Sequence, residues 1–257
     1  METRITSRDN ERVRRICRLL DEGSARAEAG CFVAESAKLC ADIAAVLPPR
    51  EVYYTEAALK KNPFLAALGG EHYLLAEHVA EKLARTRTTQ GVWAVFDTPP
   101  AAAENLSGRR ILALDAVQDP GNLGAVLRSA DASGVDAVIV CDPLTDMYNP
   151  NLIRSSIGAI FTVPIATATS EDTIKWLKSN NIKIYTAQLQ DSEWYYDTDM
   201  KGGTAIVMGT EATGLTDAWR KAADAHIKIP MLGKLDSLNV SVSAAILMFE
   251  AVRQRNS

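Results

Sequence analysis

The sequence has few of the residues that build metal sites or disulfides. Among its 257 residues there are four cysteines and three histidines. No two cysteines form a Cys-x-x-Cys pair, and the histidines are scattered along the chain. The seven residues are Cys17, Cys31, Cys40, Cys141, His72, His78 and His226. We therefore expect no metal site, and we interpret the cysteines as free, buried thiols.

Long hydrophobic runs are also missing. No apolar segment reaches the ~20 residues that a membrane-spanning helix needs. The N-terminal segment METRITSRDNERVRR lacks the apolar core of a secretory signal. We therefore expect a cytoplasmic protein with no membrane partner.

The chain has no excess of positive charge, since its formal net charge is −4. This argues against a protein that coats nucleic acid with a basic surface. One basic segment lies near the N-terminus, where Arg8, Arg12 and Arg15 have the spacing of one helix face. Such a face can be simply solvated or can bind RNA phosphates, and charge alone leaves both interpretations open.

The chain divides at residues 97–108, DTPPAAAENLSG, which contain two prolines, an alanine run and no apolar periodicity. We expect a small α/β domain at residues 1–98, a linker at 99–108 and a second domain at 109–257. In the second part, short apolar segments rich in β-branched residues alternate with helical segments. This alternation predicts an α/β fold with a parallel sheet covered by helices on both faces.

The first candidate motif is a glycine-containing turn between a predicted strand and a predicted helix, LDAVQDPGNLGAVLRSA. Backbone N–H groups at such a helix start can bind an anion. The segment GNLGAV does not fit the GxGxxG pattern of nicotinamide-binding turns, so we set that class of enzyme aside. Considered alone, Asn122 and Arg128 could be a helix cap and a surface arginine.

Two further segments follow predicted strands. AIVMGTEATGL runs from a buried strand into Gly209 and Glu211, and open α/β sheets bind ligands at such carboxyl ends. IKIPMLGKLDSLNVSVSAAI leads through Ser237 and Asn239 into the last helix, and both residues are good N-caps. Each segment alone is also explained by a turn or a capped helix.

Together and in this order, the three segments resemble the three motifs of the SpoU/TrmH branch of the SPOUT methyltransferases. The matching residues are Asn122-x-Gly124-x-x-x-Arg128, Gly209-Thr210-Glu211-x-x-Gly214-Leu215, and Ile229-Pro230-Met231 with Ser237-Leu238-Asn239-Val240-Ser241. The resemblance covers roughly residues 108–254 and includes a further family-like segment around Arg154. The first part resembles the family's small substrate-binding domain, akin to an RNA-binding ribosomal-protein fold, with Ser36 where a glycine is more usual.

The resemblance implies a C-terminal SPOUT domain with a trefoil knot, although true knots are nearly absent from proteins. It implies that the knot's loops bind S-adenosyl-L-methionine, largely through backbone atoms. The cofactor-binding residues would be Gly209, Leu215, Ile229, Met231 and Leu238. It also implies a homodimer that methylates a ribose 2′-hydroxyl in RNA, and we expect 23S ribosomal RNA as the substrate.

Arg128 resembles the arginine that the family uses in catalysis. A guanidinium is a poor base, because its pKa in solution is about 12.5 or higher. It could act as a base in a special setting, or stay charged, orient an RNA phosphate and stabilise the developing oxyanion. Asn122, Glu211, Ser237 and Asn239 would position Arg128, the ribose or the cofactor.

We expect RNA to bind at Arg8, Arg12, Arg15, Arg87 and Arg154. Three alternatives remain. The substrate could be transfer RNA, although some tRNA-modifying relatives carry basic terminal segments in place of a front domain. The protein could be a non-catalytic RNA-binding protein that keeps the fold, which the joint presence of the motif residues disfavours. The same chemistry could also serve antibiotic resistance by modifying one ribosomal site.

Overall fold

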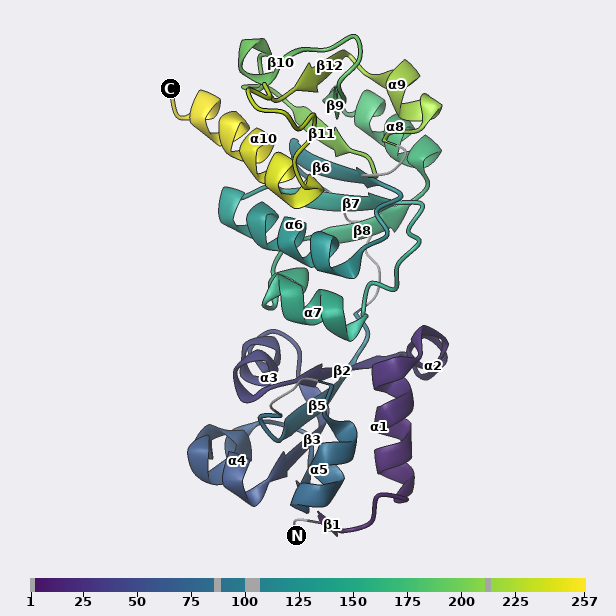
Figure 1. Ribbon diagram of the computed structural model, residues 1–257, viewed down its shortest axis with the longest axis vertical. Coiled ribbons are helices and arrows are strands. Elements are labelled where there is room, and N and C mark those ends of the chain that lie inside the picture. The colour runs from purple at the N-terminus through teal and green to yellow at the C-terminus, as the bar shows by residue number, and fades with distance from the viewer. Residues whose placement is uncertain (1–2, 86–88, 100–106, 211–213) are drawn as a thin grey trace. The chain divides into compact units, whose positions relative to one another are not determined.

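The computed structural model describes residues 3–85, 89–99, 107–210 and 214–257 (Figure 1). The chain forms two compact units. The first unit comprises Met1–Pro100 together with the later segment Asp146–Phe161, and the second comprises Ala101–Thr145 and Thr162–Ser257. No helix in the described residues is long and apolar enough to cross a membrane.

The first unit contains a five-stranded sheet with the order β1-β4-β3-β5-β2. Its strands are β1 (Thr3–Ile5), β2 (Cys31–Glu35), β3 (Pro49–Thr55), β4 (Glu71–Leu75) and β5 (Val92–Asp97). Strands β1, β4 and β3 are parallel, and β5 is antiparallel to both of its neighbours. The helical segments are α1 (Glu11–Asp21), α2 (Gly23–Ala29), α3 (Ala37–Ala44), α4 (Glu56–Lys61), η1 (Pro63–Ala67), α5 (Glu77–Leu83), α7 (Pro150–Ser156) and η3 (Ala159–Phe161).

Successive residues of the central strands supply two separate cores in this unit. Val33 and Val95 pack with apolar residues of α1 and α5. Their neighbours Phe32 and Ala94 pack with residues of α3 and α4 on the other face. This division follows from the strand geometry, because successive side chains point to opposite faces of a sheet.

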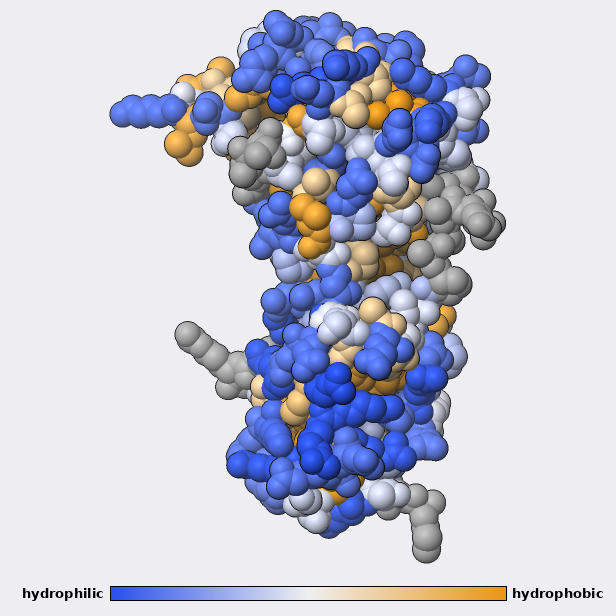
Figure 2. All heavy atoms as spheres, turned by 90° about the vertical axis from the view of Figure 1, so that its right-hand side faces the viewer, coloured by the Kyte–Doolittle hydropathy of each residue, from blue (hydrophilic) through white to orange (hydrophobic). Residues whose placement is uncertain are grey.

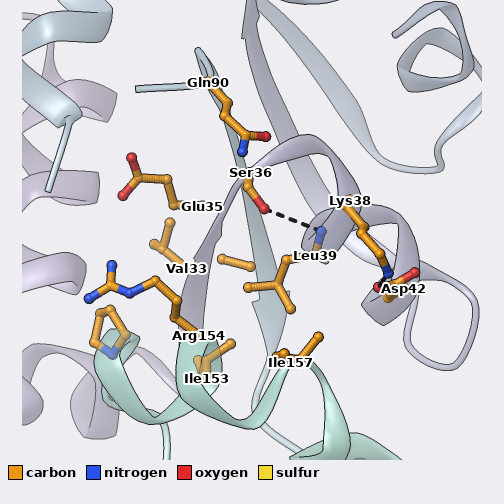
Figure 3. Close-up of a pocket in the computed structure, with 12 residues that line it drawn as sticks. Val33, Glu35, Ser36, Lys38, Leu39, Asp42, Gln90, Ile153, Arg154 and Ile157 are labelled. Atoms are coloured by element: carbon orange, nitrogen blue, oxygen red, sulfur yellow. Dashed lines mark hydrogen bonds and ion pairs between the residues drawn. The ribbon is translucent and has the colours of Figure 1, made fainter. Parts of the chain in front are cut away.

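Ser36, between β2 and α3, has a backbone conformation that suits glycine. Its φ is 108°, a region that side-chain-bearing residues adopt only at a cost of about 1–3 kcal/mol. Its hydroxyl oxygen accepts a hydrogen bond from the Leu39 backbone N–H at 3.3 Å and so caps α3 (Figure 3). The backbone geometry therefore explains why glycine is the more usual residue at this position.

Replacing Ser36 with glycine should stabilise the first unit. Relief of the strained φ outweighs the few tenths of a kcal/mol that a Ser→Gly change costs at an N-cap, so we expect a net gain of about 1 kcal/mol. Thermal and urea unfolding would measure the gain. Ser36→Ala is the control, since it keeps the strain and loses the cap, and should be less stable than the parent. A Ser36→Gly protein that is no more stable than the parent contradicts the strain argument.

The second unit is built on a seven-stranded sheet with the order β10-β12-β9-β11-β6-β7-β8, and all neighbouring pairs are parallel. Its strands are β6 (Arg110–Asp115), β7 (Ala137–Cys141), β8 (Ile165–Ala168), β9 (Lys183–Ala187), β10 (Glu193–Trp194), β11 (Thr204–Met208) and β12 (Ala225–Lys228). Its helical segments are α6 (Pro120–Ser133), α8 (Ser170–Ser179), η4 (Tyr195–Asp197), α9 (Asp217–Ala222) and α10 (Val240–Arg255).

Helices cover both faces of this sheet. Helices α6 and α10 lie side by side on one face, and α8 and α9 lie on the other (Figure 1). Ile111 and Ala113 pack with Leu177 and Trp219 from α8 and α9. The prediction of a parallel sheet covered on both faces is confirmed, while the trefoil knot stays a prediction.

The strand order reverses direction at the centre of this sheet. From β6 the chain proceeds through β7 to β8 on one side, and then returns to β9 and β11 on the other. Ligands of open α/β sheets bind beyond the carboxyl ends of the strands, near such a reversal. The second and third sequence motifs follow the carboxyl ends of β11 and β12.

Candidate cofactor and active site

A cavity of about 590 Å³ lies at the carboxyl edge of the seven-stranded sheet. It is lined by residues that follow β9, β11 and β12 and by the start of α10. All five residues that the sequence predicts to bind the cofactor line it: Gly209, Leu215, Ile229, Met231 and Leu238. Ser237 and Asn239 line it as well. The residues that meet around this cavity extend from Ala187 to Leu247 in the sequence.

Two backbone hydrogen bonds join Thr210 and Gly214 of the second motif, just after β11. The Thr210 N–H donates to the Gly214 carbonyl at 3.1 Å, and the Gly214 N–H donates back to the Thr210 carbonyl at 3.0 Å. A Cβ atom on Gly209 would lie 2.4 Å from the Gly214 carbonyl carbon. Glycine at position 209 is therefore required by the close approach of two backbone segments. Glu211 lies outside the described residues, so its predicted role stays a prediction.

The cavity has the composition of a site for a small organic molecule. Met208, Leu215 and Leu247 give it buried apolar walls, and such walls with a few polar groups are typical of cofactor pockets. The Gln188 side-chain oxygen is buried and has no hydrogen-bond partner among the described residues. A buried acceptor without a partner is costly. A ligand that carries amino or hydroxyl donors, as S-adenosylmethionine does, would satisfy it.

Asn239 joins the third motif to the first. It is the N-cap of α10, where its side-chain oxygen accepts a hydrogen bond from the Ser241 backbone N–H at 3.0 Å. Its side-chain amide donates to the Asn122 side-chain oxygen at 2.9 Å. Asn122 lies in the first turn of α6, where its backbone N–H donates to the Asp119 carboxylate at 2.6 Å. Asn239 therefore caps a helix and also holds a second predicted site residue in place.

Arg128 is exposed on α6, six residues after Asn122. It is not among the residues that line the cavity. It makes no ion pair within the part of the chain that the structure describes. Among the described residues, its guanidinium therefore has no ion-pair partner that an anionic group of a substrate would have to displace.

Asp115 does not line the cavity but supports the backbone beside it, and the motifs did not indicate this residue. Its carboxylate is buried at the end of β6 and accepts a hydrogen bond from the Thr216 backbone N–H at 2.8 Å. The Ser170 hydroxyl lies 3.4 Å from its other oxygen and accepts from the Trp219 indole N–H at 3.0 Å. Asp115 thus anchors the chain just after the second motif. The sequence feature that could have identified Asp115 is its position as an acidic residue at the end of an apolar strand.

Gln188 was also missed, although it directly follows β9 and lines the cavity. The rule that ligands bind beyond strand carboxyl ends would have identified it, had it been applied to this strand as well.

Three N-terminal arginines are paired with acidic residues of the first unit: Arg8, which precedes α1, and Arg12 and Arg15 of α1. Arg8 forms an ion pair with Glu81 at 3.0 Å, and Arg12 forms one with Glu51 at 3.0 Å. Arg15 also contacts Glu51. Hydrophilic residues dominate the face of this unit shown in Figure 2, which includes α1. RNA binding by these three arginines stays a prediction, and phosphates would have to compete with the existing carboxylates.

Arg154 is exposed beside a cavity of about 370 Å³ within the first unit. Its guanidinium contacts the Asn151 side-chain oxygen. Figure 3 shows it on the same side of the pocket as Glu35. Arg87, the remaining residue predicted to bind RNA, lies outside the described residues.

The second unit is thus an α/β domain with a cavity of mixed apolar and polar lining at the carboxyl ends of parallel strands. Within the described residues, no group of three or more His, Cys, Asp and Glu side chains could hold a metal ion. The size and lining of the cavity suit a small organic cofactor.

The chain belongs to the SpoU rRNA methylase family, whose model matches residues 109–249. Residues 10–94 match the MRM3-like substrate binding domain. The sequence resemblance to SpoU/TrmH-type methyltransferases is therefore confirmed.

Named relatives are similar over most of the chain. A 23S rRNA (guanosine(2553)-2′-O)-methyltransferase from Bacillus subtilis is 35% identical over 70% of this chain and 72% of its own. A 23S rRNA (guanosine-2′-O-)-methyltransferase from Escherichia coli K12 is 43% identical over 57% of this chain and 60% of its own. The crystal structure of an AdoMet-bound rRNA methyltransferase from Sinorhizobium meliloti has 30% identity and a TM-score of 0.85, and the match covers 98% of this chain and 97% of that one.

Proposed function

We propose that this protein transfers a methyl group from S-adenosyl-L-methionine to a ribose 2′-hydroxyl of 23S ribosomal RNA. The observation that carries the proposal is the convergence of the motifs, since the second and third motifs line one cavity and Asn239 binds Asn122 of the first. Relatives that are named 23S rRNA 2′-O-methyltransferases support the substrate. A neighbour with bound AdoMet supports the cofactor.

When bound, S-adenosylmethionine supplies an electrophilic methyl carbon. The residues of this chain must place the ribose oxygen in line with that carbon and help to remove its proton. Arg128 would contact the substrate with a guanidinium that has no internal ion pair in the described residues. It would stabilise the developing oxyanion directly or through a bound phosphate. Asn122, Asn239 and Ser237 would keep this arrangement in place, and Glu211 would contribute from the second motif.

The cofactor would be held mainly by backbone atoms and apolar walls. Gly209 and Leu215 flank the bonded pair Thr210 and Gly214, and Ile229, Met231 and Leu238 follow β12. Gln188 would add one side-chain acceptor for an amino or hydroxyl group.

The substrate is tested by mapping 2′-O-methyl groups across ribosomal and transfer RNA from cells with and without this protein. Loss of one methylated nucleotide in 23S ribosomal RNA supports the proposal. Loss of a site in transfer RNA alone would support the alternative substrate. Calorimetric titration with S-adenosylmethionine separates the enzyme from a non-catalytic RNA-binding protein, which would bind none.

We also propose that the protein is a homodimer and that it is located in the cytoplasm. Helix α10 exposes Val242 and Phe249, at 45% and 47% of their surface, on the helical layer that it shares with α6. Burying such side chains favours association. Light scattering should therefore give twice the chain mass of 27.9 kDa. A mass equal to one chain contradicts the dimer and leaves the proposed chemistry to be tested separately.

A further inference from the structure

A second cavity of the seven-stranded unit lies at the opposite edge of the sheet, where the strands begin. It measures about 540 Å³ and is open to solvent, and none of the residues assigned above to methyl transfer lines it. Its lining residues are Gly108, Arg109, Arg110, Asp136, Lys201, Gly202, Gly203 and Arg255.

The topology explains why basic residues from distant parts of the chain meet here. Strands β6 and β11 are parallel neighbours, with Arg110 beside Thr204 at their amino ends. Helix α10 begins near the carboxyl edge at Asn239 and ends at Arg255. The Arg255 guanidinium donates a hydrogen bond to the Gly202 carbonyl at 3.0 Å, which fixes it at the amino edge.

The positive charge of this cavity is only partly neutralised. Asp136 is the one acid among the described residues that line it, and it is already engaged. It forms an ion pair with Arg110 and accepts the backbone N–H groups of Arg109 and Arg110 at 2.8 and 2.9 Å. Arg109, Lys201 and Arg255 form no ion pair within the described part of the chain.

The surroundings of Arg255 also indicate crowding of like charges. Burial and, next in size, the neighbouring Arg110 lower the pKa of the Arg255 guanidinium, while Asp136 acts in the opposite direction. An anion bound between these cations would relieve their repulsion. Gly203 contributes space, because a Cβ atom there would lie 3.1 Å from the Arg109 Nε.

A purely structural explanation covers only part of this arrangement. A cation in the last turn of a helix interacts favourably with the helix dipole, which accounts for Arg255. Arg109 precedes a strand and Lys201 lies in a loop, so the dipole of α10 explains neither residue.

We propose that Arg109, Lys201 and Arg255 form a binding site for phosphodiester groups of RNA that lie away from the methylated nucleotide. This inference rests on the proposed function, because an RNA substrate is what would bring such phosphates to this edge. The open shape fits a chain that continues beyond the cavity, whereas a single enclosed anion would need a closed site. Contacts of this kind position a nucleic acid without reading its sequence.

Salt-dependent RNA binding tests this site. The variant is Arg109→Ala/Lys201→Ala, which leaves the methyl-transfer residues intact. The control is Lys178→Ala/Lys221→Ala, which removes the same charge from exposed lysines on α8 and α9. Fluorescence anisotropy would measure binding of a labelled polyuridine RNA by the full-length protein over a range of KCl concentrations. Circular dichroism melting would check that each variant folds.

Losing two phosphate contacts should reduce the slope of log affinity against log salt by about 1.4, with a loss of affinity on the order of tenfold at low salt. The control should keep the parent slope. Equal slopes for variant and control overturn the proposal. Saturable binding of inorganic phosphate by calorimetry, lost in the variant while RNA binding stays unchanged, also overturns it in favour of a free-anion site.

The two proposals fail in different ways. If the parent protein transfers no methyl group to 23S ribosomal RNA, the proposed function fails, while the slopes with polyuridine still report on this site. If methyl transfer is normal and the slopes are equal, the basic site alone is wrong.

Discussion

Replacing Arg128 with alanine should reduce methyl transfer to RNA by at least about 100- to 1,000-fold, the range seen when one charge-stabilising group is removed from an active site. The affinity for S-adenosylmethionine should stay within error of the parent value, because Arg128 does not line the cofactor cavity. A tritiated-methyl assay on unmodified ribosomal RNA and calorimetric titration of the cofactor would measure the two quantities. The exposed position of Arg128 makes a folding defect unexpected.

Arg128→Lys separates the two roles open to this residue. If a fixed positive charge orients a phosphate, lysine should restore part of the activity, although it lacks the planar fork of a guanidinium. If the group acts as a base, the pH dependence of the rate should change with the side chain. Lys178→Ala, on the opposite face of the sheet, is the surface control. Near-normal turnover of Arg128→Ala would remove this residue from the mechanism.

Much of the fold of the second unit could be predicted, because short sequence segments indicate its strands and helices one by one. The alternation of apolar strands and helices specifies a parallel sheet, and the carboxyl ends of parallel strands meet at one edge. Residues that follow β11 and β12 therefore had to lie close together. The double role of Asn239 was not predictable in this way, because its bond to Asn122 spans 117 positions. The sequence offered two separate explanations for Asn239, a helix cap or a site residue. In the structure it is both, because the side chain that caps α10 also binds Asn122.

The packing of Asp146–Phe161 into the first unit had no signal in the sequence pattern. This segment lies between β7 and β8 of the second unit, and it is held by aromatic and ionic contacts over long sequence separations. Phe32 stacks on Tyr148 and on Phe161 at 5.2 Å between ring centroids, and Arg26 pairs with Asp146 at 2.5 Å. Contacts of this kind depend on the assembled sheet and leave no periodicity.

The sequence also could not predict which acidic residues neutralise the N-terminal arginines Arg8, Arg12 and Arg15. Their spacing predicts one helix face, but α1 spans Glu11–Asp21, so the helix includes Arg12 and Arg15 while Arg8 lies in the turn before it. The carboxylate of Glu51, on β3, contacts both arginines. The sequence gives no indication of this partner, because it lies 36 and 39 positions away. A basic run therefore predicts a surface but does not predict how much of its charge is available to RNA.

Replacing Gly209 with alanine should weaken S-adenosylmethionine binding by about 10- to 100-fold. The added Cβ would lie 2.4 Å from the Gly214 carbonyl carbon and 2.6 Å from the Leu215 backbone nitrogen. Both atoms belong to the backbone, so the side of the loop that holds Gly214 and Leu215 has to move. That movement breaks one or both hydrogen bonds between Thr210 and Gly214, each worth about 0.5–1.5 kcal/mol. A loss of about 1.4 kcal/mol corresponds to a tenfold change in affinity.

Gly233→Ala is the matched control, because no atom lies within 4 Å of the position that its Cβ would occupy. It should bind the cofactor as tightly as the parent protein. Calorimetric titration measures the affinities, and circular dichroism melting shows whether the Gly209→Ala protein is folded. The same displacement of Leu215, a buried residue of the core beside α9, should also lower the melting temperature of Gly209→Ala. Parent-like affinity in a folded Gly209→Ala protein would show that the close backbone approach of Gly209 and Gly214 does not help to hold the cofactor.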